Sequence, residues 1–283
     1  MRKAFDKIME VVFLVLACVS IVAVVLVCYF MFSRGIPAMK EIGLGDFLAG
    51  KVWKPSNGFY GILPMIVGSL LVTAGALVIG VPVGIFMAVF MARFCPKPVY
   101  KIASPIVNLL AGIPSIIYGF FGMMVIVPFV RDNIGGKGYS ILSASIILGI
   151  MVLPTIISVS ESAIRAVPES YYEGALALGA TKEISVFKTV VPAAKSGIMA
   201  AVTLGVGRAI GETMAVQMVV GNQARLPESI LDGVRTLTTN IVTEMGYAAD
   251  LHRESLIATG VVLFVFILMI NLLLAIIKRR KDG

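Results

Sequence analysis

The sequence predicts an all-α membrane protein that crosses the bilayer about six times, and three observations lead to this fold class. First, 58% of the 283 residues are hydrophobic and only 14% are charged, whereas soluble domains carry about 25% charged residues. Second, six apolar stretches approach the length of about 20 residues that a helix needs to span a bilayer. Third, Lys and Arg residues lie in short clusters between these stretches, which is how membrane topology is encoded.

The apolar stretches place the expected membrane helices. They cover residues 11–32, 64–91, 105–130, 141–159, 197–221 and 256–277. The third contains Pro114, and we expect it to be kinked or broken because an internal proline removes a hydrogen bond and clashes with the preceding turn. In the outer connection that follows the fifth stretch, residues 236–245 are expected to form a helix at the membrane interface. We assign residues 1–60 to an N-terminal helix with an outer loop, and residues 61–283 to the membrane core.

An even number of spans places both termini on the same side of the membrane. With the termini inside, 14 Lys and Arg residues lie in the inner segments and 9 in the outer ones, while Arg208 lies within the fifth span. This excess predicts a multi-pass protein of the cell membrane with both termini in the cytoplasm. It also accounts for the net charge of +8 without nucleic-acid binding, which needs a concentrated basic face.

The sequence contains no motif for binding a metal ion or ATP. Cys18, Cys28 and Cys95 match no zinc-binding spacing, and His252 is the only histidine. No Walker A sequence occurs, so the chain does not itself carry the phosphates of ATP. We therefore expect a protein that is not an enzyme and that has no metal or cofactor of its own.

Glycine pairs four residues apart predict close helix packing in two of the spans. Gly80 and Gly84 form such a pair in the second span, and Gly207 and Gly211 form one in the fifth. The glycines of the fifth span do not make a dinucleotide-binding fingerprint, because Ile210 stands at the third glycine position and no strand precedes the motif.

The fifth stretch also carries two charged residues at membrane depth. Arg208 is expected near the middle of the bilayer core, and Glu212 lies four residues later on the same helix face. A charge at that depth costs at least ~2.5–3.5 kcal/mol, so we expect both residues to face the protein interior as a pair. The guanidinium group offers five donors in a rigid fork that suits phosphate-like oxyanions. A pathway for anions and a purely structural ion pair are both compatible with this pattern.

Hydroxyl groups follow the proline of the third span. Ser115 and Tyr118 lie just after Pro114 at membrane depth, where unwound backbone is tolerated only beside protein or a cavity. A role in lining a substrate pathway and the plain packing of a kinked helix fit these two residues equally well.

The longest inner connection, residues 160–196, is too polar to enter lipid and too short to be an independent domain. A short helix is expected around residues 168–178, with Pro168 in its first turn and Gly179 as a left-handed cap after its end. By spacing alone, this segment also fits an ordinary helical linker.

Part of this inner loop resembles the EAA motif of ABC-importer permeases, which reads Glu-Ala-Ala, three residues, Gly, nine residues and Ile-x-Leu-Pro. The matching residues are Glu173, Gly174, Ala175, Gly179 and Pro192. Gly174, Thr189 and Val191 depart from the motif by replacing its Ala, Ile and Leu. The resemblance implies the MetI-like core of a type I ABC-importer permease, in which this helix docks into a cleft of a separate ATPase subunit.

Two further segments, residues 112–119 and 207–215, narrow the resemblance. Together with the docking loop, they make nearly the whole chain similar to PstC-type permeases of phosphate-specific ABC importers, and less similar to the companion PstA-type permeases. The resemblance implies a PstA-like permease subunit, a PstB-like ATPase dimer that uses the ATP, and a PstS-like phosphate-binding protein as partners. It also implies that Arg208 and Glu212 match charged positions associated with transport.

Other functions fit parts of the pattern. An importer of another oxyanion, such as sulfate or molybdate, would have the same architecture. A membrane anchor for a signalling or enzymatic complex would need neither charges at the middle of the membrane nor a docking loop. A proton-coupled carrier could use the charged pair, but its two halves would usually show internal repeats, and none is evident in the sequence.

Overall fold

The structure is a computed structural model that describes residues 2–281. Its helices are α1 Arg2–Ile42, α2 Leu44–Ala49, α3 Leu63–Val89, α4 Lys97–Gly112, α5 Ser115–Phe121, α6 Val127–Asn133, α7 Ile141–Arg165, α8 Glu169–Ala177, α9 Lys182–Ser185, α10 Val191–Ala193, α11 Lys195–Gly211, α12 Met214–Val219, α13 Leu237–Glu244 and α14 Asp250–Lys281. Three π-helical turns, η2 Phe90–Phe94, η3 Gly122–Ile126 and η4 Val186–Val190, extend or join these helices. A small antiparallel hairpin of β1 (Trp53–Lys54) and β2 (Phe59–Tyr60) is the only sheet among the described residues.

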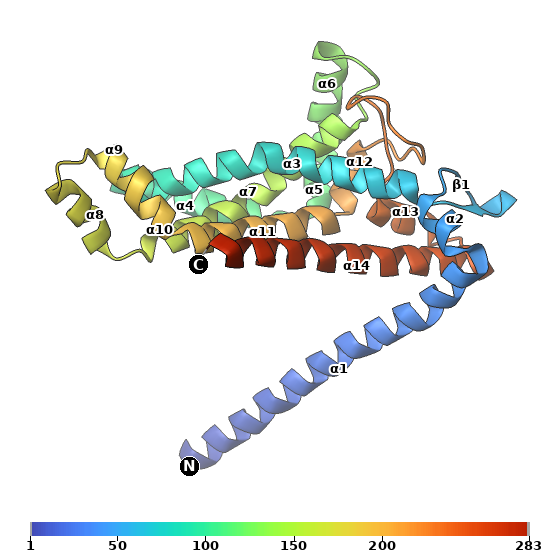
Figure 1. The fold of residues 1–283 in the computed structure, drawn as a ribbon, viewed down its shortest axis with the longest axis horizontal. Coiled ribbons are helices and arrows are strands. Elements are labelled where there is room, and N and C mark those ends of the chain that lie inside the picture. The colour runs from blue at the N-terminus through green and yellow to red at the C-terminus, as the bar shows by residue number, and fades with distance from the viewer. Residues whose placement is uncertain (1, 282–283) are drawn as a thin grey trace.

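Helices α3, α7, α11 and α14 run along a common long axis (Figure 1). Helices α8 and α9 lie at one end of this bundle, and α2, α13 and the hairpin lie at the other. Five helices of the described chain are long and apolar enough to cross a membrane: Met9–Ile42, Leu63–Phe94, Ser115–Asn133, Ile141–Arg165 and Asp250–Ile276. A further span comes from Lys182–Ala193 and Lys195–Gly211, which are bent by 69°. The prediction of about six spans is confirmed.

The third span is broken where the sequence predicted a kink. Helix α4 ends at Gly112, Ile113 and Pro114 have extended backbone, and α5 begins at Ser115. A proline disfavours helical geometry in the residue before it, which explains the extended conformation of Ile113. The membrane-spanning part therefore begins at Ser115, later than the predicted start at residue 105.

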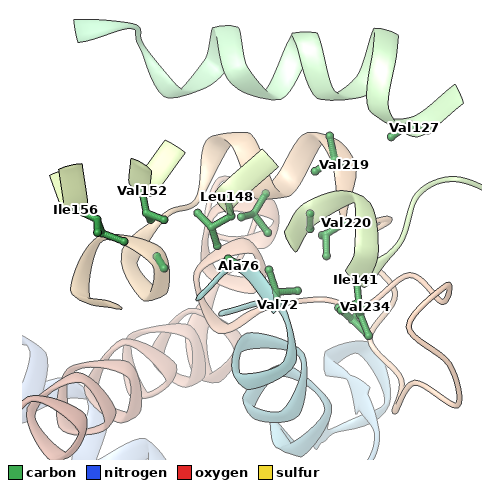
Figure 2. Packing of buried hydrophobic residues seen from close by; sticks show 13 residues of the cluster. Val72, Ala76, Val127, Ile141, Leu148, Val152, Ile156, Val219, Val220 and Val234 are labelled. Carbon is green, nitrogen blue, oxygen red and sulfur yellow. The ribbon is translucent and has the colours of Figure 1, made fainter. Parts of the chain in front are cut away.

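The core forms where α3 packs along α7. Figure 2 shows side chains from α3, α7 and α12 that meet there, with Val72, Ala76, Leu148, Val152, Ile156, Val219 and Val220 labelled. A Cβ atom on Gly80 would lie 2.7 Å from Cγ2 of Val152, and one on Gly84 would lie 2.7 Å from Cγ2 of Ile156. The predicted close packing at this glycine pair is confirmed, because a larger residue would force the two helices apart.

Helix α1 diverges from the bundle and meets it only near its C-terminal end (Figure 1). There a Cβ atom on Gly35 would lie 2.8 Å from Cγ2 of Val261 in α14, and the rings of Phe32 and Phe264 contact edge to face at 6.0 Å. The long apolar stretch before this contact is exposed within the chain. Lipid or another protein must cover it, since water cannot solvate such a surface favourably.

The connection between α12 and α14 contains more structure than the sequence predicted. Helix α13 occupies the predicted position, but its side chains at Leu237, Thr238, Thr239 and Asn240 are buried. The predicted helix is therefore present and packs into the protein, and its place at the membrane interface stays a prediction. Its N-terminus is stabilised by a capping box formed by Thr236 and Thr239, and such a box satisfies two backbone donors at once.

A buried carboxylate ties the outer segments together. Glu244, at the end of α13, is hydrogen-bonded to Nε1 of Trp53 at 2.9 Å, to Nε2 of His252 at 2.8 Å and to Nη1 of Arg235. Burial raises the pKa of Glu244, but the three hydrogen bonds outweigh burial and hold the pKa below that of an ordinary glutamate. One ionised side chain thus joins the hairpin, α13 and the start of α14.

We expect Glu244→Gln to lower the free energy of unfolding of the detergent-solubilised protein by about 3–5 kcal/mol at pH 7, because Arg235 loses its buried counter-charge. The stabilisation by the carboxylate is complete above about pH 4.3, the ordinary value for glutamate. It is lost as the pH falls through the lower pKa of the folded state. The difference between wild type and variant should therefore shrink in acid.

The matched control is Glu254→Gln, which removes a carboxylate from a surface pair with Arg34 at 3.5 Å. An exposed pair of this kind contributes about 0–1 kcal/mol. A loss at Glu244 no larger than at Glu254, or a difference that does not depend on pH, would contradict the assigned role of the buried carboxylate.

Candidate functional site

The predicted fifth span is interrupted at its charged residues. Helix α11 ends at Gly211, Glu212 has extended backbone with φ −69° and ψ 132°, and α12 begins only after Thr213. Glycine is a poor helix former, and a side-chain oxygen just before a helix is favoured because it can accept hydrogen bonds from that helix. Both preferences place the break here.

The predicted pairing of Arg208 with Glu212 is wrong. The two residues do not share a helix face, because the helix ends between them, and they form no ion pair within the described chain. Glu212 Oε1 instead accepts hydrogen bonds from the backbone N–H groups of Thr213 at 3.1 Å and Ala215 at 3.3 Å. Arg208 lies in the last turn of α11, where the negative end of the helix dipole favours a cation. Each charge is therefore compensated by a helix end.

Arg208 lies on an open face of α11. Leu204 and Gly211 on the same face are exposed, and a Cβ atom on Gly207 or Gly211 would meet nothing within 4 Å. The prediction that Gly207 and Gly211 pack against another helix is therefore wrong for this chain alone. Within the described residues, Arg208 is half-buried and donates no hydrogen bond to another side chain. Its guanidinium group is therefore free to bind an anion.

The two broken spans meet beside this face. Gly119 of α5 packs closely on α12, since a Cβ atom there would lie 2.7 Å from Sδ of Met218 and 2.9 Å from Cα of Ala215. Tyr118, one residue earlier, is buried in a cluster that includes Ala215 of α12. The structure thus places Tyr118 of the third span beside the helix that follows Glu212 in the fifth.

Tyr118 also has a structural role that the sequence did not reveal. Its hydroxyl group donates a hydrogen bond of 2.8 Å to the carbonyl oxygen of Leu110, across the break between α4 and α5. A broken helix leaves carbonyl groups without partners inside the helix, so this bond satisfies one of them. Ser115 is the half-buried first residue of α5.

Two residues that sequence analysis missed hold the break of the fifth span. Thr238 Oγ1 donates a hydrogen bond of 3.1 Å to the carbonyl oxygen of Glu212, and Ser69 Oγ accepts one of 2.9 Å from the backbone N–H of Leu237. These contacts bring the N-terminus of α13 to the break and to α3. The run of threonines at 236, 238 and 239 was a readable signal for a helix cap, but nothing local indicated what it would contact.

The helix predicted around residues 168–178 is confirmed as α8. Gly179 has φ +86°, a left-handed conformation that favours glycine, and its N–H donates to the carbonyl oxygen of Leu176 at 2.9 Å. Glu173 and Gly174 are exposed, as is Pro192, and Ala175 is half-buried. The motif therefore lies on an exposed surface that includes both Glu173 and Leu178, at the end of the bundle opposite α13 (Figure 1).

Comparison with known proteins agrees with this architecture. Residues 80–283 match the family described as the binding-protein-dependent transport system inner membrane component. The probable ABC transporter permease protein YqgH of Bacillus subtilis is 40% identical over 94% of this chain and 88% of its own length. The phosphate transport system permease protein PstC of Mesorhizobium japonicum is 34% identical over 89% of this chain and 84% of its own. The probable PstC of Methanocaldococcus jannaschii is 32% identical over 96% and 94%.

Solved structures share the fold. A bacterial ABC transporter for the import of alginate matches with a TM-score of 0.63 at 16% identity, over 94% of this chain and 95% of its own. The MetNI methionine ABC transporter matches with a TM-score of 0.58 at 23% identity, over 78% of this chain and 94% of its own. These likenesses identify the MetI-type permease fold.

Members of this family are multi-pass inner-membrane proteins that work with a second permease, an ATPase and a binding protein. The chain belongs to the family of binding-protein-dependent transport system inner membrane components, and it is an ABC permease, a transport subunit rather than an enzyme.

Proposed function

We propose that this chain is the PstC-type permease subunit of an ATP-driven phosphate importer. The observation that carries the proposal is the open guanidinium group of Arg208, which lies at a helix end beside Gly207 and Gly211, where a Cβ atom would meet nothing, and which is not neutralised by Glu212. Five donors in a planar fork suit a tetrahedral oxyanion. The names of the PstC relatives support phosphate as that oxyanion.

The pathway needs a second surface opposite Arg208. The face of α11 with Leu204, Gly207 and Gly211 is open in this chain, and a charged group at membrane depth must be shielded from lipid. A PstA-like permease subunit would provide the other wall. In this pathway Arg208 binds the anion, and Glu212 stabilises the helix break that positions Arg208. Ser115 and Tyr118, in the neighbouring third span, line the pathway.

The inner end of the bundle supplies the coupling. Helix α8 presents Glu173 and Gly174 to solvent, so these residues are accessible to the cleft of a PstB-like ATPase dimer. ATP is hydrolysed on that dimer, and this chain contributes no cofactor. A PstS-like protein delivers phosphate to the opposite end, near α13 and the hairpin. The α8 end, with both termini, then lies in the cytoplasm.

We expect Arg208→Gln to reduce ATP-dependent uptake of labelled phosphate at least tenfold in proteoliposomes that contain the whole complex. Assembly should persist, because removing Arg208 leaves no buried carboxylate without a partner. Uptake by Arg208→Lys should lie between that of the wild type and that of Arg208→Gln, since lysine keeps the charge but lacks the planar fork of donors. Arg34→Gln, which removes an exposed arginine charge, is the matched control and should transport normally.

Competition identifies the substrate in the same assay. A large excess of unlabelled phosphate should strongly reduce uptake of the label by dilution, and the same excess of sulfate should not. Normal uptake by an assembled Arg208→Gln complex would remove Arg208 from the pathway, and equal competition by sulfate would refute the specificity for phosphate.

We expect Glu173→Lys to leave assembly and ATP hydrolysis intact while uptake of phosphate is lost, because Glu173 is exposed and makes no contact that the fold needs. Gly179→Ala should weaken coupling less, since a left-handed alanine costs about 1–2 kcal/mol and its Cβ would meet nothing. Glu183→Lys, an exposed change in the same loop outside the motif, should behave as wild type. Full uptake in Glu173→Lys would argue against docking by α8.

The orientation can be tested with single cysteines in a background that lacks Cys18, Cys28 and Cys95. Impermeant thiol reagents added outside should label cysteines at Asn57 and Ser229 but not one at Leu178, which is 91% exposed at the end of α8. Ser185 is unsuitable as the inner probe because it is buried. Labelling at Leu178 alone would reverse the proposed topology.

A further inference from the structure

The π-helical turn η2, at the inner end of α3, contacts both halves of the docking loop. Toward the first half, Arg93 Nη1 forms an ion pair of 2.6 Å with Glu169 Oε2, and its guanidinium carbon lies 5.8 Å from the ring centre of Tyr172. Glu169 and Tyr172 are three residues apart and so lie on one face of α8. Arg93 thus contacts two residues in the first two turns of α8, while Glu173 remains exposed for docking.

The adjacent residue of the same turn holds the second half of the loop. Phe94 stacks on Phe187 with ring centres 6.3 Å apart, and Nζ of Lys182 lies 5.3 Å from the centre of the Phe94 ring. A cation over an aromatic face is attracted to it. One short turn of α3 therefore fixes α8 on one side and α9 with η4 on the other.

The turn is also fixed to α7. Nη2 of Arg165 donates a hydrogen bond of 2.8 Å to the carbonyl oxygen of Met91, while its Nε bonds Glu161 Oε1 at 2.7 Å. The guanidinium carbon of Arg165 lies 4.7 Å from the ring centre of Tyr100 in α4. The inner ends of α3, α4 and α7 are thereby held as one unit, to which Arg93 attaches α8.

The energetics indicate that the Arg93–Glu169 pair serves geometry more than stability. The Glu169 side chain is 57% exposed and that of Arg93 is 12% exposed; pairs this close to solvent contribute about 0–1 kcal/mol. The backbone from Ala166 to Pro168 already tethers one end of α8 to α7. A tether leaves rotation free, whereas a second contact through a planar guanidinium sets the orientation of the helix.

We propose that Arg93 is a positioning residue that locks α8 to the inner end of α3, so that a displacement of α8 moves α3 and α7 as one body. This inference rests on the proposed docking of α8 to an ATPase. No substrate contact is involved, and the role of Arg93 is separate from that of Arg208.

A charge swap in the complete complex tests the proposal. Arg93→Glu and Glu169→Arg, made singly, should each leave ATP hydrolysis measurable while the phosphate transported per ATP falls at least fivefold. The double variant Arg93→Glu with Glu169→Arg should recover at least half of the wild-type ratio. Glu183→Arg, which adds the same charge to the loop away from Arg93, should keep the wild-type ratio. Unchanged ratios in the single variants, or a double variant no better than the singles, would overturn the proposal.

If the complex with Arg93→Glu does not assemble, two conservative variants test the proposal instead. Arg93→Lys should keep most of the coupling, whereas Glu169→Gln should lower the ratio at least twofold although it alters only an exposed side chain. Equal ratios in these two variants would overturn the proposal.

A distance measurement separates this inference from the proposed function, because it does not depend on the substrate. Spin labels at Leu178 and at Val78, which is 74% exposed on α3, should keep their distance when ATP binds to the wild-type complex. In Glu169→Arg the distance should change. If the wild-type complex transports no phosphate, only the assignment of phosphate as the substrate is refuted. If the distance between the two labels changes when ATP binds to the wild-type complex, the role of Arg93 is refuted.

Discussion

The break after Gly211 is the feature on which the site depends, because a helix interrupted at membrane depth leaves backbone groups that lipid cannot satisfy. Glu212 solves this problem locally with its carboxylate, which accepts two backbone N–H groups of α12. The carbonyl oxygen of Glu212 is satisfied from outside the span by Thr238. The connection between α12 and α14 must therefore reach into the bundle, which explains why α13 is buried and why Ser69 of α3 bonds its first turn.

The same break also separates Arg208 from Glu212, so the two charges do not form a pair. In a continuous helix, Glu212 would stand one turn beyond Arg208 and neutralise it, and the pair would serve packing as readily as transport. Here the carboxylate is engaged with a helix N-terminus, and the guanidinium group stands at a helix C-terminus, where the dipole favours it without using its donors. A charge that is stabilised but not hydrogen-bonded is what a binding site for an anion requires.

The features that could be predicted from the sequence are those that depend on residues close together along the chain. Long apolar runs located the spans, Pro114 located the break of the third, and the glycine at 179 located the end of α8, because hydropathy, proline and left-handed caps act locally. The break at Glu212 was missed because its carboxylate competes with a helical pattern that the sequence also allows. The bonds of Glu244 and Arg93 join segments 191 and 76 residues apart, and no pattern along the chain encodes such partners.

Helix α7 connects the two functional regions. At its inner end Arg165 bonds the carbonyl oxygen of Met91 in η2. Farther along α7, Ile156 packs against Gly205 of α11, where a Cβ atom would lie 3.0 Å from Cγ1 of Ile156. Close-packed interiors have low compressibility and transmit strain, so α7 cannot shift without moving the segment three residues before Arg208. The segment that carries Arg208 is thereby linked to α8 by packing at Gly205, by the hydrogen bond of Arg165 and by the ion pair of Arg93, so a movement of α8 would reach the proposed anion site.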